Sequence, residues 1–261
     1  MLAESSASGD PKRRTTIEKV KVLPFYAIII GRWPYDSIIS PLAIRSLRSS
    51  YEKKKPETIP ELVDFCMKFD YVGVNCRPFQ VRSEIIRLLE IVKAKKPKVI
   101  LEIGTAKGGT LFLFSKIAPE GARILSLDLP GLAGESFFRR WRASFFRSFG
   151  GQKTKIILYW LDSHSRRSFG KIKRALGGEA LDVLFIDGDH SYEGAKRDFE
   201  MYSGLVKHGG IVAMHDIVKH PPEAKCDVDI FFHELEKKYK TERIVEDENQ
   251  GWGGIGIVRM P

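Results

Sequence analysis

The sequence predicts an α/β fold in three layers, with a doubly wound, mostly parallel sheet between two layers of helices. After residue 97, short apolar runs alternate with amphipathic segments, which is the order of parallel strands joined by helices. Two of these runs, at 181–187 and 210–214, lead directly into acids and histidines. Ligands bind beyond the carboxyl ends of parallel strands, so both observations indicate the same architecture.

The composition is that of a globular protein with one large core. Of the 261 residues, 43% are hydrophobic and 29% are charged. The nearest candidate for a membrane span, at 22–31, is too short and contains Pro24, so weak peripheral membrane association is the alternative. The three cysteines form neither an even disulfide set nor a Cys-x-x-Cys pair, and we therefore expect a reducing, cytoplasmic environment.

The chain is expected to consist of an N-terminal extension and a main domain at 78–261. Residues 1–15 are polar, small and basic, which predicts a disordered tail. Residues 16–77 are predicted to form a helical or irregular extension, or a lid over the substrate. Prolines interrupt this extension, and the run at 51–56 is typical of a linker.

Local signals place the helices and strands. Thr58 and Pro60 predict the start of one helix, and a second helix is expected after Pro78. Five apolar runs are typical of buried parallel strands, at 99–103, 123–128, 155–161, 181–187 and 210–214. Helical spacing is found at 108–118, 134–148, 165–176, 192–205 and 227–239. The last two strands, at 242–245 and 255–259, have no helix between them, which predicts an antiparallel pair at the sheet edge.

The segment at 129–176 is strongly basic, with 11 Lys and Arg against two Asp and Glu. Within it, aromatic and basic residues alternate at helical spacing over 137–147, so one helix face can pack while the other stays cationic. One interpretation is a solvated helix face above a core stripe. The other is a surface for an anionic partner, such as a phosphorylated substrate, a nucleic acid or an anionic lipid surface.

Acids and histidines follow the strands predicted at 181–187 and 210–214. If these strands are neighbours, their ends bring together Asp187, Asp189, His190, His215 and Asp216. So many ionisable groups are not stable in a dry core, and a cation, a substrate or water is needed to explain them. A divalent cation held by carboxylates is the leading candidate.

A glycine-rich loop follows the first predicted strand and contains Gly104, Thr105, Gly108 and Gly109. Glycines allow a sharp turn, and the next helix presents free N–H groups to a ligand. The second strand ends in Asp128, where nucleotide-binding α/β folds place an acid on the ribose. The third strand is followed by Asp162 and Ser163. Together these features predict a nucleotide-like cofactor.

The motifs at 101–109 and 185–192, with Asp128, Asp162 and the run at 209–216, resemble class I S-adenosylmethionine-dependent methyltransferases. Within that class, the sequence is similar to the branch that contains cephalosporin-hydroxylase-like proteins and O-methyltransferases of antibiotic sugars. The resemblance implies a Rossmann-like, seven-stranded sheet. It also implies that Glu102 and the glycine loop hold the methionine end of the cofactor, Asp128 the ribose and Asp162 the adenine. Ser163 and Asp187 are expected beside them.

The metal-dependent members of that class imply roles for the acid and histidine cluster. Asp187, His215 and Asp216 would hold a divalent ion, with magnesium or manganese as candidates because His215 replaces the more usual carboxylate. Either His190 or Asp189 would act as the base, and the pKa of a histidine favours His190. The alternative for His190 is a structural role, in which it caps the following helix through Ser191.

The resulting expectation is metal-assisted O-methylation of a small-molecule hydroxyl, on a sugar, lipid or natural product that could be anionic. Three alternatives stay open: an RNA methyltransferase that uses the basic segment, an NAD-dependent oxidoreductase, and a non-catalytic Rossmann-like binding protein. We also expect a homo-oligomer.

Overall fold

The structure is a computed structural model that describes residues 41–129 and 136–261. Three sequence-based predictions therefore lie outside the described residues: the tail at 1–15, the part of the extension at 16–40, and the stretch of the basic segment at 130–135.

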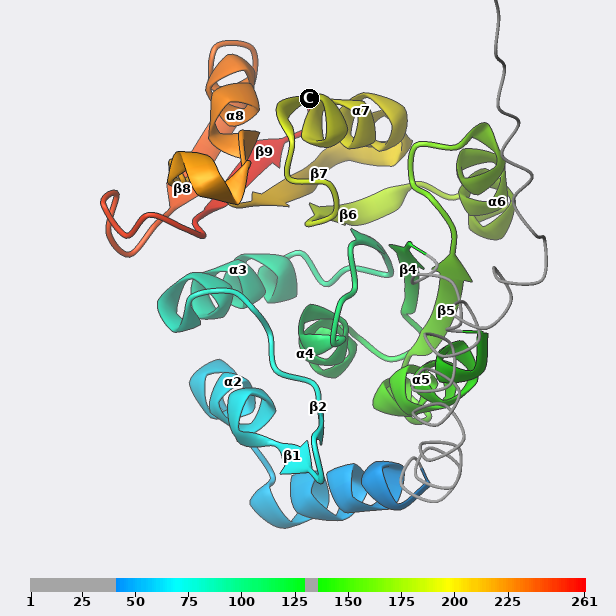
Figure 1. Ribbon diagram of the computed structural model, residues 1–261. Helices are drawn as coiled ribbons and strands as arrows, with labels where there is room; N and C mark the ends of the chain where they lie inside the picture. Colours follow the sequence, from blue (N-terminus) through cyan, green and yellow to red (C-terminus); the bar gives the residue numbers. More distant parts are fainter. Residues whose placement is uncertain (1–40, 130–135) are drawn as a thin grey trace, which may run out of the picture.

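A seven-stranded sheet forms the centre of the molecule, in the order β5-β4-β3-β6-β7-β9-β8 (Figure 1). The first five strands in that order are parallel, and β9 runs antiparallel between β7 and β8. This confirms the predicted α/β sheet and its antiparallel C-terminal pair. The strands are β3 (Val99–Ile103), β4 (Arg123–Asp128), β5 (Lys155–Trp160), β6 (Leu181–Ile186), β7 (Val206–His215), β8 (Lys240–Ile244) and β9 (Ile255–Arg259).

Helices cover both faces of the sheet, because strand side chains alternate between two separate cores. Ile100 packs toward one face and Leu101 toward the other. On the first face lie α3 (Arg82–Ala94), α4 (Gly109–Ile117) and α5 (Ser136–Gly150) (Figure 1). On the second face lie α6 (Arg166–Leu176), α7 (Tyr192–Tyr202) and α8 (Val228–Glu236).

Before α3, the chain forms a helix at 41–54, then α2 (Ile59–Lys68), β1 (Asp70–Tyr71) and β2 (Val74–Asn75). As predicted, Thr58 caps α2. Its side chain accepts the Glu61 N–H at 3.3 Å, while the Glu61 carboxylate accepts the Thr58 N–H at 3.1 Å.

The predicted linker at 51–56 is wrong in its first part, because the helix continues to residue 54. Tertiary packing extends it. The Tyr51 ring lies edge-on to Phe65 at 5.4 Å and to Phe112 at 6.0 Å, so Tyr51 joins the aromatic core of α2 and α4. Residues 41–77 therefore share a core with the first face of the sheet.

Two strands begin earlier than the sequence predicts. β7 starts at Val206 rather than near Gly210, because Val206 pairs with Leu181 of β6. A short 3-10 helix, Ser203–Leu205, joins it to α7. β8 starts at Lys240, where pairing with Arg259 of β9 extends it.

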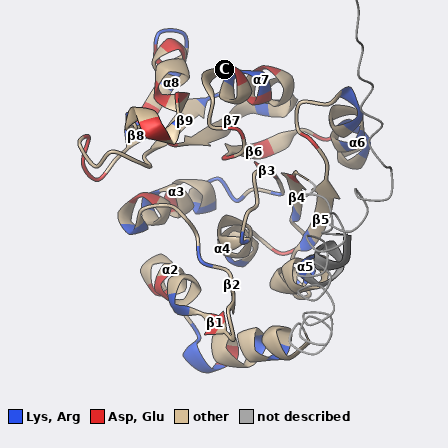
Figure 2. Cartoon of the chain, in the orientation of Figure 1, with Lys and Arg blue, Asp and Glu red and all other residues tan. Residues whose placement is uncertain are grey.

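Charge is unevenly distributed over the fold. Figure 2 shows basic residues on the helix at 41–54 and on α6, and acidic residues on the loop after β8. In α5, Phe145 and Phe149 are buried while Arg147 is exposed, as its amphipathic pattern predicts. Among the described residues, none of the helices combines the length and the apolar character needed to cross a bilayer.

The aromatic core around Phe112 should make a large contribution to stability. Phe112 is fully buried and contacts Phe65 and Phe149. Phe112→Ala should lower the free energy of unfolding by about 3–5 kcal/mol, measured by urea denaturation. Leu42→Ala, at a side chain that is 41% exposed, is the control and should change stability by less than about 0.5 kcal/mol. A loss below about 1 kcal/mol for Phe112→Ala would contradict the packing described.

Candidate active site

A cavity of about 330 Å³ lies at the carboxyl ends of β3, β4, β5 and β6. The parallel order brings the four strand ends to one edge of the sheet, which is where ligands of such folds bind. Of the residues that the sequence predicted for the site, the following line the cavity: Gly104, Asp128, Asp162, Ser163, Asp187, Asp189 and His190. The ends of these four strands are adjacent in the sheet.

The glycine loop is shaped by close contact within the chain. A Cβ on Gly104, which has a φ of +85°, would lie 1.8 Å from the carbonyl oxygen of Asp187. Gly108, the N-cap residue of α4, has a φ of +78°, and a Cβ on it would meet the Phe146 ring at 2.6 Å. A Cβ on Gly109 would be 2.4 Å from the backbone nitrogen of Pro78. Glycine is required at these positions by the packing of the loop against β6, α5 and the chain before α3.

Glu102 is the fourth residue of β3, and Thr105 lies in the loop between β3 and α4. The hydroxyl of Thr110 donates to Glu102 Oε1, and the hydroxyls of Thr105 and Ser126 are 2.6 Å apart. The second oxygen of Glu102, Oε2, is buried and has no hydrogen-bond partner among the described residues. Burial raises the pKa of Glu102 to about 8.

Two acids lie on the cavity wall, Asp128 as the last residue of β4 and Asp162 just after β5. The Asp128 carboxylate accepts the Leu129 N–H at 2.9 Å, and burial raises its pKa while the nearby Arg142 lowers it. Asp162 Oδ1 accepts the His164 N–H at 2.8 Å. The backbone carbonyl of Ser163 accepts the Tyr202 hydroxyl at 2.7 Å, which fixes this turn against α7.

The three predicted metal ligands come together at the ends of β6 and β7. Asp187, His215 and Asp216 each offer a ligand atom, and these atoms lie within 4.8 Å of one another. His215 Nδ1 is 3.1 Å from Asp187 Oδ1 and 3.2 Å from Asp216 Oδ1. Burial opposes a charge on this imidazole, but the two carboxylates raise the pKa of His215 to about 10. The donor set of two carboxylates and one imidazole fits a divalent ion.

Three imidazoles surround Asp216, and they can supply positive charge in place of a cation. His190 Nδ1 lies 2.8 Å from Asp216 Oδ2, and His220 Nε2 lies 3.3 Å from Asp216 Oδ1. Burial raises the pKa of Asp216, but hydrogen bonds from His190 and His215 hold it well below its usual range. The cluster therefore neutralises much of its own charge. The histidines thus supply part of the balancing charge that we assigned from the sequence to a cation, a substrate or water.

His190 and Asp189 have different surroundings. Asp189 Oδ1 accepts the Ser191 N–H at 2.9 Å, and a Cβ on Gly194 would lie 2.1 Å from Asp189 Cγ, so Asp189 is packed into the start of α7. The cap of α7 is Ser191, whose side chain accepts the Gly194 N–H at 3.1 Å. The side chain of His190 is 47% exposed and makes its contact with Asp216 instead.

Sequence reasoning missed two buried residues that hold the site. Gln80 Nε2 donates to Asp187 Oδ2 at 2.7 Å. Glu84, also near the start of α3, accepts the Gly254 N–H at 2.9 Å and the Gln250 side-chain amide at 2.8 Å. No local pattern marks either residue, because their partners are more than 100 positions away in the chain.

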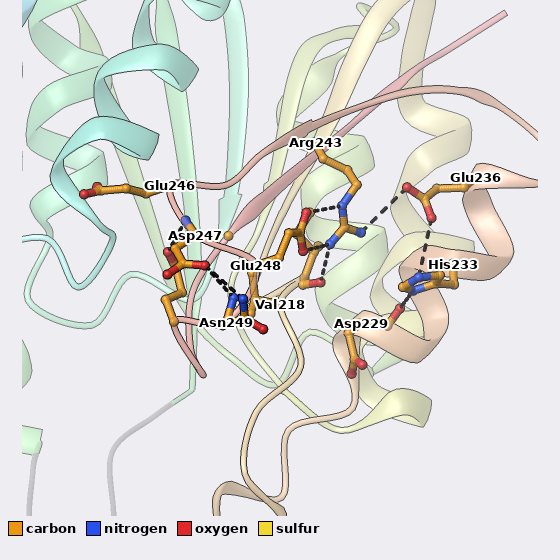
Figure 3. A network of polar contacts seen from close by, with 12 residues as sticks. Val218, Asp229, His233, Glu236, Arg243, Glu246, Asp247, Glu248 and Asn249 are labelled. Atoms are coloured by element: carbon orange, nitrogen blue, oxygen red, sulfur yellow. Dashed lines mark hydrogen bonds and ion pairs between the residues drawn. The ribbon is translucent and has the colours of Figure 1, made fainter.

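A polar network secures the loop after β8 beside the cluster (Figure 3). Arg243 donates to Glu248 at 2.9 Å and to the Ile217 carbonyl at 3.3 Å, and lies 3.7 Å from Glu236. Gly253, at the end of the loop, donates its N–H to Asp216 Oδ1 at 3.2 Å. Asp216 has a φ of +65°, so this loop supports a residue in an unusual backbone conformation.

The buried carboxyl of Glu102 predicts a pH dependence of stability. The folded protein retains a proton up to about pH 8 that the unfolded chain releases near pH 4.5, so the free energy of unfolding should fall as pH rises between these values. Glu102→Gln keeps an acceptor for Thr110 without the charge. In urea unfolding without cofactor, this variant should be more stable than wild type at pH 8 by at least about 1 kcal/mol. The exposed Glu120→Gln is the control, and identical pH profiles for Glu102→Gln and wild type would refute the expectation.

Comparisons with known proteins agree with this geometry. Residues 101–217 match a family model described as a methyltransferase domain. The uncharacterized protein R132 of Acanthamoeba polyphaga mimivirus is 28% identical over 151 residues, which cover 57% of this chain and 66% of that relative.

Two solved structures have the same fold. An O-methyltransferase from Bacillus cereus in complex with SAH has a TM-score of 0.53 and 16% identity, covering 82% of this chain and 96% of that chain. The O-methyltransferase TomG from Streptomyces achromogenes, involved in tomaymycin synthesis and in complex with SAM, has a TM-score of 0.50 and 17% identity, covering 88% and 98%. Residues 101–217 therefore resemble a methyltransferase domain in sequence, and the chain has the fold of these two O-methyltransferases.

Proposed function

We propose that this protein transfers the methyl group of S-adenosylmethionine to a hydroxyl of a small-molecule acceptor. The observation that carries the proposal is the cavity at four adjacent strand ends, with the acid and histidine cluster directly beside it. Asp187 belongs to both, so a methyl donor in the cavity would lie next to the groups that can prepare an acceptor.

The cavity fits the proposed cofactor in size and in polar groups. Its volume of about 330 Å³ is within the usual range for ligand pockets. Asp128 would accept the ribose hydroxyls, and Asp162 and Ser163 would lie beside the adenine. The loop at Gly104 would approach the sulfonium end of the cofactor.

Asp187, His215 and Asp216 are the residues that would hold a divalent metal ion. Such an ion would bind the acceptor hydroxyl and lower its pKa. The imidazole in the set suits manganese and other ions that accept nitrogen ligands, as well as magnesium. To bind an ion, His215 would release a proton to solvent, and its Nδ1 would exchange its contacts with the two carboxylates for a contact with the ion.

His190 is the proposed base. It lines the cavity, and its Nδ1 is held by Asp216 at 2.8 Å. With Nδ1–H donated to a carboxylate, the neutral ring carries its lone pair on Nε2, which is then the atom that accepts a proton from the acceptor hydroxyl. Asp189 is less suited, because its carboxylate is engaged at the start of α7.

One exposed apolar side chain lines the cavity, and two more belong to segments that contact the cluster acids. Leu129 lines the cavity and is 63% exposed. Phe79 and Trp252 are also exposed, and each directly precedes a residue that contacts the cluster acids, Gln80 and Gly253 respectively. An acceptor with an apolar face beside its hydroxyl fits this rim.

Loss of the Asp128 carboxylate should weaken cofactor binding. Asp128→Ala removes an acceptor for two ribose hydroxyls, and we expect the affinity for S-adenosylmethionine to fall about 10- to 100-fold in calorimetric titration. Glu120→Ala, at an exposed carboxylate at the opposite end of the sheet, should bind as wild type does. Unchanged binding by Asp128→Ala would refute the assignment of this cavity to S-adenosylmethionine.

The metal assignment can be tested without knowledge of the acceptor. Wild type should bind one Mn²⁺, seen as loss of the free-ion signal in electron paramagnetic resonance. Asp216→Asn, which tolerates a positive φ, should bind it at least about tenfold more weakly and still bind S-adenosylmethionine. Asp229→Asn, on α8 and outside the cluster, is the matched control. Equal Mn²⁺ affinity in both variants would contradict the proposed ligand set.

A further inference from the structure

A second group of metal-binding side chains shares Asp216 with the proposed ligand set. His190, Asp216 and Cys226 each offer one ligand atom, and these atoms lie within 4.8 Å of one another. They come from three separate segments: the turn after β6, the residue after β7, and the residue before the N-cap of α8. The free thiol of Cys226 distinguishes this group from the proposed ligand set, which contains only oxygen and nitrogen donors.

The two oxygens of Asp216 face different neighbours. Oδ1 lies 3.2 Å from His215 Nδ1 and also accepts the Gly253 N–H at 3.2 Å. Oδ2 lies on the other side of the carboxylate, 2.8 Å from His190 Nδ1. The contact between Oδ2 and His190 is therefore separate from the contacts of the proposed ligand set, and Cys226 lies next to it.

Backbone and core contacts hold Cys226 beside His190. The N–H of Asp227, the residue after Cys226, donates to the His190 carbonyl at 2.9 Å. Asp227 is also the N-cap of α8, and α8 packs on α7 through the rings of Phe231 and Phe199, whose centroids are 5.8 Å apart. Because α7 begins just after His190, both segments are fixed to the same pair of helices. The positions of the thiol and the imidazole are thus set by the packing of the core.

The surroundings of the thiol carry negative charge. Burial raises the pKa of Cys226 to about 11, while a hydrogen bond from the Val228 N–H lowers it. Three nearby carboxylates, those of Asp216, Asp227 and Asp229, raise it further. The free thiol is therefore protonated, and a cation that binds the sulfur would release this proton to solvent. The carboxylates that oppose a bare thiolate would attract that cation.

An ion can reach this group of side chains from the cavity. The side chain of His190 is 47% exposed and lines the cavity, whereas Asp216 and Cys226 are buried behind it. Three protein ligands with one side open to solvent leave room for a water molecule as the fourth ligand, which is the usual arrangement of an open zinc site.

We propose that His190, Asp216 and Cys226 form a second metal site, which binds Zn²⁺ and similar ions that accept sulfur ligands. A thiolate, an imidazole and a carboxylate suit zinc, while magnesium prefers oxygen ligands alone. His190 binds the ion through Nδ1, the nitrogen that faces Asp216, so the proton of the neutral ring lies on Nε2. In the part of the inference that rests on the proposed function, an ion at this site prevents His190 from acting as the base.

The test uses Co²⁺, because a thiolate ligand gives this ion a charge-transfer absorption band in the near ultraviolet. The full chain with reduced thiols should show this band on titration with Co²⁺, and Zn²⁺ should displace the cobalt and remove it. Cys226→Ser should lose the band, and His190→Gln should bind Co²⁺ at least about tenfold more weakly. Cys66→Ser is the matched control at another buried free cysteine and should keep the band.

Urea unfolding of each variant separates the loss of a metal ligand from the loss of the fold, and Cys226→Ala replaces Cys226→Ser if the serine variant does not fold. The inference is overturned if wild type shows no charge-transfer band, or if the band persists without the Cys226 thiol. Unchanged Co²⁺ affinity in His190→Gln would also overturn it, because the ion would then not contact the proposed base.

Failure of the proposed function would give a different result. None of these measurements uses S-adenosylmethionine. A wild-type protein that shows the Cys226-dependent band but binds no S-adenosylmethionine would contradict the proposed function and would still support the second metal site.

Discussion

The site depends on the close approach of the loop after β3 to the end of β6. Asp187 donates its N–H to the Ile103 carbonyl at 2.8 Å, and there is no room for a Cβ on Gly104 beside the Asp187 carbonyl. This contact places one carboxylate between the cavity and the cluster of His215 and Asp216. A side chain on Gly104 would separate the two loops, and with them the cavity from the cluster of Asp187, His215 and Asp216.

In this cluster, the imidazoles and the carboxylates balance one another's charge. The buried carboxylates are stable here because imidazole N–H groups donate hydrogen bonds to them. Asp216, for example, lies within 3.3 Å of His190, His215 and His220. A metal ion at this position would replace imidazole–carboxylate contacts that already exist. The free energy of metal binding is therefore the difference between the metal–ligand contacts and the contacts that they replace. The same contact orients His190, since Asp216 fixes which ring nitrogen carries the proton.

The segments before β3 take part in the site, although the family match begins only at residue 101. The aromatic contacts of Tyr51 and Phe65 with Phe112 attach this part of the chain to α4. Attached there, it brings Gln80 to Asp187 and Glu84 to the loop that holds Asp216. The candidate site thus lies at the strand ends, while residues just before β3 hold two of its parts in place.

Local patterns in the sequence were sufficient for the sheet and for much of the site. Apolar runs marked the strands, and the acids that follow them, such as Asp128 and Asp187, converge because parallel strands end at one edge. The tertiary structure alone decided which of these groups touch, that Asp189 belongs to a helix start, and that Gln80 enters the site. The physical reason is that strand and helix signals act over a few residues, whereas these contacts join positions up to 107 apart whose proximity depends on how the whole core packs.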